Sequence, residues 1–208
     1  MADRARLDDR ADSADRIVFL GHATVLIEID GVRLLTDPLL RDRVAHLRRQ
    51  VPPLDPAVFA GPDAVLISHL HRDHLDLASL RLLGLDVPLL APTGAGELLR
   101  RTGFIDVTEL GVGETANVGA LVVTAVEARH DGRRRPGPRG ERAATLGYVV
   151  DGRRTAYFAG DTELFEGMGA LAASRLQVDD TPGGVPRLDV APGGVPRLDV
   201  APGGVPRL

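Results

Sequence analysis

Residues 68–74 read Ser-His-Leu-His-Arg-Asp-His, and this stretch holds three of the six histidines of a 208-residue chain. It overlaps the end of a short apolar run, 64–68, which predicts a buried strand. Where the backbone stays extended, His69 and His71 are two residues apart and both rings leave on the same face. Three adjacent histidines repel one another when protonated, and a bound metal ion removes that conflict. The stretch therefore predicts a metal site at the end of a strand.

Asp73 and His74 follow after the chain turns, so they can face a second metal centre close to the first. Nitrogen and oxygen ligands of this kind suit Zn²⁺, Mn²⁺ and Fe alike, and the set alone does not select the ion. The plain alternative is a polar strand-to-helix loop in which Asp73 caps the helix. The density of histidines favours the metal site over that alternative.

Short strands and helices surround this motif. Strands are predicted at 16–20, 24–29, 32–36, 64–68, 87–91, 121–126, 146–150 and 155–159, and helices at 77–83, 94–101 and 163–173. The pairs Asp30-Gly31 and Asp151-Gly152 are typical hairpin turns. Because the strands come mainly in hairpins with helices between them, the pattern indicates an α/β chain with a mixed or antiparallel sheet covered by helices, rather than a Rossmann alternation.

Composition excludes several kinds of chemistry. The chain has no cysteine, and all 25 of its basic residues are arginine, which excludes disulfides, thiolate sites and lysine Schiff bases. The net charge of −4 argues against a nucleic-acid partner held by bulk charge. No stretch approaches the roughly 18 apolar residues of a membrane span, and no signal peptide is recognisable. We therefore expect a cytoplasmic protein with a small-molecule substrate, of unspecified oligomeric state.

The two ends of the chain differ from its middle. Residues 1–15 alternate Asp and Arg with Ala, which predicts a flexible, solvated arm. From residue 182 a Pro- and Gly-rich decapeptide repeats to the last residue, which predicts turns and extended segments and disfavours central strands. The expected organisation is an arm at 1–15, a domain at 16–175 and a repeat tail at 176–208.

Five motifs, taken in order, resemble the metallo-β-lactamase superfamily of metal-dependent hydrolases. The closest resemblance is to the branch that holds ascorbate-6-phosphate lactonases and N-acyl-phosphatidylethanolamine phospholipase D-like enzymes. The motifs are LGHAT at 20–24, LTDP at 35–38, the segment 68–76, ARH at 128–130 and FAGDT at 158–162. The resemblance covers about residues 16–172 and implies a four-layer αββα sandwich of the α/β class, incomplete at its C-terminal side.

The resemblance also implies roles for the residues that match. His69, His71 and His130 would bind one divalent ion. Asp37 would hold a ligand histidine by its other ring nitrogen, which fixes the tautomer and raises basicity. Outside such a pattern, a lone histidine after a strand, like His130, is usually an ordinary surface or core residue.

For the second ion the resemblance implies Asp73 and His74, with Asp161 as a bridge between two ions. These three residues would be catalytic, and the ions would be Zn²⁺, with Mn²⁺ or Fe as alternatives. The implied reaction is attack by a metal-bound hydroxide on an ester, lactone or phosphodiester. Asp161 alone, at a predicted helix start, would be interpreted as a cap.

Other polar residues near these motifs are candidates for substrate contact. They are His22, Arg133, Arg134 and Arg135. An arginine run can grip a phosphate or carboxylate, although a Pro/Gly/Arg loop is more often a solvated surface. His22 can equally line the site or satisfy a local hydrogen bond, and His46 lies in an Arg-rich segment and is expected to be solvated.

The sequence departs from the family pattern in one respect. No histidine follows His130, whereas the family pattern has one more metal-ligand histidine in a C-terminal segment. Besides a hydrolase, two alternatives stay open: a truncated member that binds metal but is catalytically weak or inactive, and a non-catalytic scaffold whose Pro/Gly tail recruits a partner. The histidine cluster argues against the scaffold.

Overall fold

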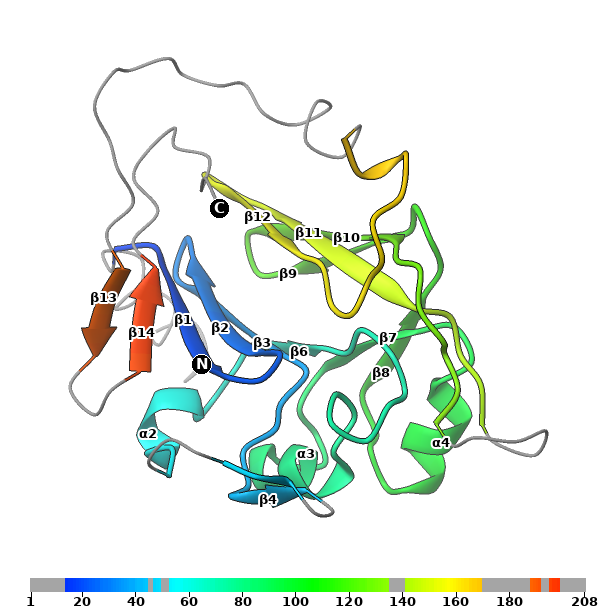
Figure 1. The fold of residues 1–208 in the computed structure, drawn as a ribbon, viewed down its shortest axis with the longest axis horizontal. Coiled ribbons are helices and arrows are strands. Elements are labelled where there is room, and N and C mark those ends of the chain that lie inside the picture. The colour runs from blue at the N-terminus through cyan, green and yellow to red at the C-terminus, as the bar shows by residue number, and fades with distance from the viewer. Residues whose placement is uncertain are drawn as a thin grey trace.

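The computed structural model describes residues 14–44, 47–49, 53–134, 141–169, 188–191 and 195–198. The strands form two main β-sheets that stack face to face (Figure 1). A separate two-stranded ribbon pairs β4 (Arg43–Val44) with β5 (Leu47–Arg48). No helix within the described ranges is both long and apolar enough to cross a membrane.

The larger sheet has eight strands. They are β1 (Arg16–Gly21), β2 (Thr24–Ile29), β3 (Val32–Thr36), β6 (Ala64–Leu66), β7 (Leu89–Pro92), β8 (Val107–Leu110), β13 (Leu188–Ala191) and β14 (Val195–Leu198). Their order in the sheet is β13-β14-β1-β2-β3-β6-β7-β8. The pairs from β13 to β3 are antiparallel, and those from β3 to β8 are parallel. The expected mixed sheet is confirmed.

The smaller sheet is antiparallel and has four strands. They are β9 (Thr115–Val118), β10 (Leu121–Glu127), β11 (Leu146–Asp151) and β12 (Thr155–Phe158), in the order β12-β11-β10-β9. The β11-β12 hairpin forms across 152–154, as predicted. Because β10 and β12 both run antiparallel to β11, their carboxyl ends lie at the same edge of the sheet.

Alternation along the central strands divides the core into two layers. Leu34 and Leu66 face the smaller sheet, where they pack with Val123, Tyr148 and other buried residues. The neighbouring Leu35 of β3 faces the opposite way, into a second cluster beneath the helices. One face of the larger sheet is thus buried against a sheet and the other against helices, which matches the layered sandwich expected from the sequence.

Three short helices are described: α2 (Pro56–Phe59), α3 (Leu77–Leu83) and α4 (Gly96–Arg101). They lie on the side of the larger sheet away from the smaller one (Figure 1). The side chain of Asp76 caps α3 by accepting from Ser79 N, and Gly84 ends the helix at φ 109° as predicted. The helix cap is therefore Asp76, which leaves the carboxylate of Asp73 available for another task.

Some predicted elements differ from the observed ones. The strand predicted at 64–68 ends at Leu66, so the histidine motif starts in irregular backbone. The helix predicted at 163–173 is wrong over 163–167; only 168–169 are helical, and later residues lie outside the described ranges. Its start is delayed because Glu163 N donates to the carbonyl of Arg129 at 3.0 Å. Strands β8 and β9 were not predicted, since half-exposed runs such as 115–118 carry little apolar pattern.

The repeat contributes backbone to the larger sheet through β13 and β14. Strand β14 contains Pro196 yet lies between β13 and β1. Its pairing with β1 uses only Arg197 and Leu198, so the missing amide hydrogen of Pro196 is not needed there. The predicted extended segments are observed at these two places. Strand β13 lies at the sheet edge, whereas β14 lies in an inner position that the prolines argued against.

Candidate metal centre

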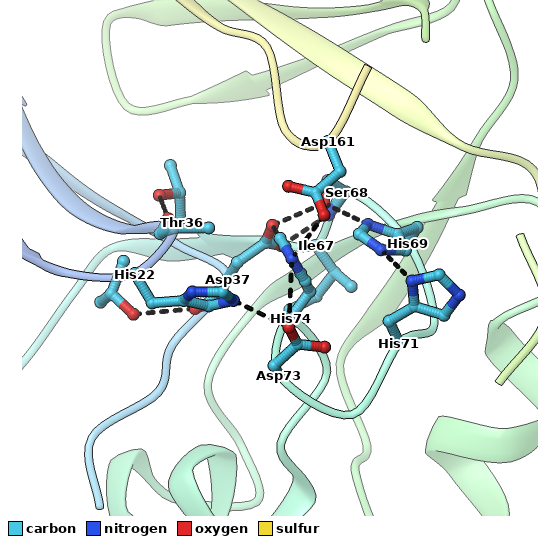
Figure 2. A network of polar contacts seen from close by, with 12 residues as sticks. His22, Thr36, Asp37, Ile67, Ser68, His69, His71, Asp73, His74 and Asp161 are labelled. Carbon is cyan, nitrogen blue, oxygen red and sulfur yellow. Dashed lines mark hydrogen bonds and ion pairs between the residues drawn. The ribbon is translucent and has the colours of Figure 1, made fainter. Parts of the chain in front are cut away.

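Strand direction brings the motifs to one edge of the sandwich. Strands β3 and β6 are parallel neighbours, so Asp37 after β3 and the stretch 68–74 after β6 emerge side by side. His130 and Asp161 follow β10 and β12, whose carboxyl ends also share an edge. Four segments distant in sequence thereby meet at this edge, and Figure 2 shows the side chains of Asp37, of the histidine motif and of Asp161 gathered there.

His69, His71 and His130 form one cluster. The Nε2 atom of His69 lies 2.9 Å from Nδ1 of His71, and Nε2 of His130 lies 3.2 Å from the same Nδ1. One ligand atom from each residue lies within 4.8 Å of the others. The first three histidines named by the sequence are therefore brought together, with their ring nitrogens turned toward a common point.

The environment of His69 keeps its imidazole neutral. The side chain is fully buried, and burial together with the neighbouring histidines lowers the pKa of His69 to about 2. Its Nδ1 lies 2.9 Å from Ser68 Oγ, whose hydroxyl donates to Asp37 Oδ2 at 2.5 Å. Since that hydroxyl proton is committed to Asp37, Nδ1–H donates to Oγ and the lone pair is on Nε2.

Asp37 orients the second buried histidine. Its Oδ2 accepts from Nδ1 of His74 at 2.7 Å, and its Oδ1 accepts from Ser68 N at 2.7 Å. All partners of the Asp37 carboxylate are donors, which stabilise its ionised form although burial raises the pKa of this group. The contact leaves Nε2 of His74 as the ring nitrogen directed into the site. Asp37 is thus placed where it contacts a histidine of the motif through the ring nitrogen that faces away from the site.

Nε2 of His74 is buried and has no hydrogen-bond partner. It faces Asp161 Oδ2 at 3.2 Å and Asp73 Oδ2 at 3.9 Å. Burial lowers the pKa of His74, but the carboxylates of Asp37, Asp161 and Asp73 outweigh it and the net shift is upward. Two carboxylates facing one ring nitrogen favour a positive charge at this position, which a proton or a bound cation can supply.

Asp161 lies between the two groups of histidines. The same oxygen, Oδ2, is 3.2 Å from Nε2 of His74 and 3.9 Å from Nε2 of His130. Gly160 precedes it at φ 60°, where an added Cβ would lie 2.8 Å from Ser68 Cβ. Glycine at 160 therefore lets the chain pass close to the histidine motif and deliver Asp161.

His22 reaches the site from the turn between β1 and β2. Its Nε2 lies 2.9 Å from Asp73 Oδ2, and its ring centroid lies 5.0 Å from that of His74. These three residues offer ligand atoms within 4.8 Å of one another. A second group of possible ligands thus lies beside the first, as Figure 2 shows.

The arginines named as candidates for substrate contact are placed differently. Arg134 directs Nη1 at the carbonyls of Leu70 and Leu75, at 3.0 and 3.1 Å. This contact ties the loop after His130 to the backbone of the histidine motif. Arg133 is exposed and its backbone forms an isolated bridge with Arg142. Arg135 and His46 lie outside the described residues.

Residues that the sequence did not single out support the site. Ser68 joins Asp37 to His69, and a hydroxyl directly before the motif was its only signal. Tyr148 is buried in β11 and donates from its hydroxyl to the carbonyl of Ile67 at 2.8 Å. Thr36 donates from Oγ1 to the carbonyl of Ala23 at 2.8 Å, which holds the turn that carries His22. No local pattern distinguishes these residues from ordinary core positions.

The donor set suits a pair of divalent ions. The described atoms are imidazole nitrogens and carboxylate oxygens, with no thiolate among them, as borderline or hard ions prefer. The buried Nε2 of His74 makes no hydrogen bond and lies 3.2 Å from Asp161 Oδ2, and a cation bound between these two atoms would satisfy both. The residues therefore fit a metal centre on their own chemistry.

Sequence comparison identifies relatives along most of this region. Residues 32–180 match the family described as the beta-lactamase superfamily domain. An uncharacterized protein of Mycobacterium tuberculosis is 39% identical over 156 residues, covering 70% of this chain and 42% of that protein. The N-acyl-phosphatidylethanolamine-hydrolyzing phospholipase D 1 of Caenorhabditis elegans is 29% identical over 173 residues, covering 74% of this chain and 49% of that protein. The chain thus spans less than half the length of either relative.

Structural comparison agrees. CmlA, a diiron beta-hydroxylase from Streptomyces venezuelae, superimposes with a TM-score of 0.60 at 25% identity, covering 79% of this chain and 33% of that chain. Among the relatives found by sequence, several carry the name metal-dependent hydrolase. A family pattern that matches more than half of the sequence, on a sandwich whose edge gathers histidines and aspartates, places this chain in the beta-lactamase superfamily, with the metallo-β-lactamase fold.

Proposed function

We propose that the chain forms the metal-binding core of a hydrolase that acts on an ester, a lactone or a phosphodiester. One observation carries the proposal: a ring nitrogen from each of the two histidine groups, Nε2 of His74 and Nε2 of His130, faces the single oxygen Oδ2 of Asp161. The buried Nε2 of His74, without a hydrogen-bond partner, belongs to one of these groups. A structural histidine would instead have both nitrogens satisfied.

The residues divide into two positions. His69, His71 and His130 would hold one ion, and Asp73 and His74 would hold the second. Asp161 would contribute to both. Zn²⁺ is the ion we propose first, and Mn²⁺ and Fe suit the same atoms.

A pair of divalent ions held there would supply positive charge that polarises the substrate and a nucleophilic hydroxide near neutral pH. The chain's own residues prepare the site for it. Asp37 and Ser68 hold the rings of His74 and His69 by their Nδ1 atoms, so that each Nε2 faces inward. Because both rings are fully buried, they are orientated before any ligand arrives, which lowers the cost of binding.

The names of two kinds of relative support the proposed substrate class. The Caenorhabditis elegans relative is named as a phospholipase D that hydrolyses N-acyl-phosphatidylethanolamine. A phospholipase D cleaves a phosphodiester bond. Other relatives are named metal-dependent hydrolases. Their names support hydrolysis as the reaction but specify no substrate. Arg133, exposed beside the His130 loop, is our candidate for contact with a substrate anion.

Metal analysis and hydrolysis assays test the proposal together. The full chain is purified, freed of metal with a chelator, and reloaded with Zn²⁺ or Mn²⁺. We expect at least one tightly held ion per chain, and metal-dependent hydrolysis of bis-p-nitrophenyl phosphate, a p-nitrophenyl ester or a simple lactone. The double variant His69→Ala/His71→Ala should lose both metal retention and turnover, while its circular dichroism stays close to wild type.

The two assays separate the alternatives. Metal retention without turnover of any probe would favour a metal-binding but catalytically inactive chain. A folded chain that retains no ion would contradict the whole set of proposed ligands.

A further inference from the structure

We infer that His22 is a direct protein ligand of the second metal position, together with Asp73 and His74. The inference rests on the proposed function, because it needs a metal centre at this edge. It changes the task of His22 from substrate contact to metal binding. It also gives the second position a histidine from the start of the domain.

Distances between the ligand atoms support a shared ion. Atoms bound to one ion at about 2.0–2.2 Å lie about 3.0–3.5 Å apart along the edges of an octahedron or tetrahedron. Nε2 of His22 is 2.9 Å from Asp73 Oδ2, and Nε2 of His74 is 3.9 Å from that oxygen. These separations bracket the expected edge, and all three ligand atoms lie within 4.8 Å of one another.

The same spacing occurs in the first cluster. There, Nε2 of His69 and of His130 lie 2.9 and 3.2 Å from Nδ1 of His71. The group around His22 therefore has the compactness of a ligand set that the sequence motif itself indicates.

The second observation is the unsatisfied nitrogen of His74. Its Nε2 is buried without a hydrogen-bond partner, and the ring of His22 lies 5.0 Å from its own, inclined by 60°. An ion between them would satisfy that nitrogen. His22 is 41% exposed, so it closes the site on the solvent side, where an ion would enter.

The backbone is strained to hold His22 in this place. It adopts φ 55°, next to Gly21 at φ 113°, and a register shift interrupts the β1-β2 pairing there. The turn is fixed on both sides: Thr36 Oγ1 donates to the carbonyl of Ala23, and Arg49 Nη1 donates to the carbonyl of Leu20. The left-handed backbone conformation is strained for a histidine, and such strain is concentrated at functional sites.

Of the five histidines in the described ranges, four belong to the proposed ligand set, and His22 is the fifth. Two other tasks compete for it. As a substrate contact, it would leave metal stoichiometry unchanged when replaced. As a hydrogen-bond donor that positions Asp73, it would be replaced adequately by glutamine, whose amide also donates.

Metal titration of the full chain distinguishes these tasks. Metal-free wild type, His22→Ala, His22→Gln and His69→Ala are titrated with Zn²⁺ by calorimetry, and bound ions are counted after desalting. The same proteins are loaded with Co²⁺, and the visible ligand-field spectrum is recorded. None of these measurements depends on activity. Circular dichroism checks that each variant is folded.

We expect wild type to bind two ions per chain. His22→Ala should retain the first, while the dissociation constant of the second rises at least about 100-fold, as expected when a ligand is removed. His22→Gln should not restore binding of the second ion. In both His22 variants, the visible absorption of the second Co²⁺ equivalent should differ from that of wild type. His69→Ala should instead weaken metal binding at the first position.

Three results would overturn the inference while leaving the proposed function in place. They are a wild type with one ion only, a His22→Ala variant that binds two ions with unchanged affinity, and full rescue by glutamine. A wild type that binds no ion would overturn the proposed function as well.

Discussion

The two ends of the sandwich both gather charged side chains, but they satisfy them in different ways. At the end that carries the β2-β3 and β11-β12 turns, arginines pair directly with aspartates. Arg153 lies 2.9 Å from Asp15 Oδ1 and 3.4 Å from Asp30 Oδ1, and Arg154 lies 3.3 Å from Asp15 Oδ2. Guanidinium groups stay charged at any relevant pH, so this end is neutralised by the chain itself.

The opposite end pairs carboxylates with imidazoles. Asp37 Oδ2 accepts from Nδ1 of His74. Asp161 Oδ2 lies 3.2 Å from Nε2 of the same ring, which is buried and makes no hydrogen bond. Imidazole can bind a metal ion and a charged guanidinium cannot, so the proposed cation belongs to the histidine end. Polar clusters thus serve folding at one end and, on the proposed function, metal binding at the other.

The largest effect is expected for Asp37→Asn at the histidine end. The amide keeps the shape but removes the negative charge that holds Nδ1 of His74. We expect metal affinity to fall about 10- to 100-fold, measured by competition with a chromogenic chelator. Unchanged affinity would show that Asp37 contributes packing only and would weaken the contrast between the two ends.

A backbone variant, Gly160→Ala, comes next. Its Cβ would lie 2.8 Å from Ser68 Cβ and 3.1 Å from Ser68 Oγ, at φ 60°. We expect a loss of about 2 kcal/mol in the free energy of unfolding, measured by denaturant titration. Gly61→Ala is the matched control, since Gly61 has the same φ but no atom within 4 Å of an added Cβ. It should lose only about 1 kcal/mol, and equal losses would contradict a tight fit beside Ser68.

Asp76→Asn tests a charged pair beside the histidine loop. Asp76 accepts from Arg41 Nε and Nη2, both at 2.7 Å, and from Ser79. Burial raises the pKa of Asp76, but these donors outweigh it and the net pKa is lowered. Its charge therefore stabilises the fold above the ordinary pKa of about 4, and that stability is lost as the pH falls below it.

We expect Asp76→Asn to lose about 1 kcal/mol near neutral pH. The difference from wild type should shrink between about pH 4 and pH 2, measured as Tm against pH. A difference that stays constant with pH would contradict the ionised pair.

The smallest effect is expected for Arg153→Ala at the arginine end. Arg153 is 61% exposed, and exposed ion pairs contribute little. We expect a Tm lower by less than about 2 °C, a difference that fades in about 1 M salt, and unchanged metal binding. A loss of metal affinity in this variant would show that the two ends are coupled.

Local sequence predicted much of the fold because burial alternates strongly in its central strands. The hairpins at Asp30-Gly31 and Asp151-Gly152, the helix over 77–83 and the strand over 121–126 all form close to where they were expected. Half-exposed β9 and the start of the helix after 163 were not predicted correctly, since pairing with β10 and a contact with the Arg129 carbonyl decide them. Such long-range contacts leave no local pattern.

For the candidate site, the sequence alone supplied the residue types: the motif at 68–74, and His130 and Asp161 through their order along the chain. Only the tertiary structure decided what each could do. Burial keeps His69 neutral, Ser68 and Asp37 select the ring nitrogens that face inward, and strand direction brings His22 onto Asp73. Charge state, tautomer and distance depend on groups far apart in sequence, so they are properties of the folded chain rather than of any motif.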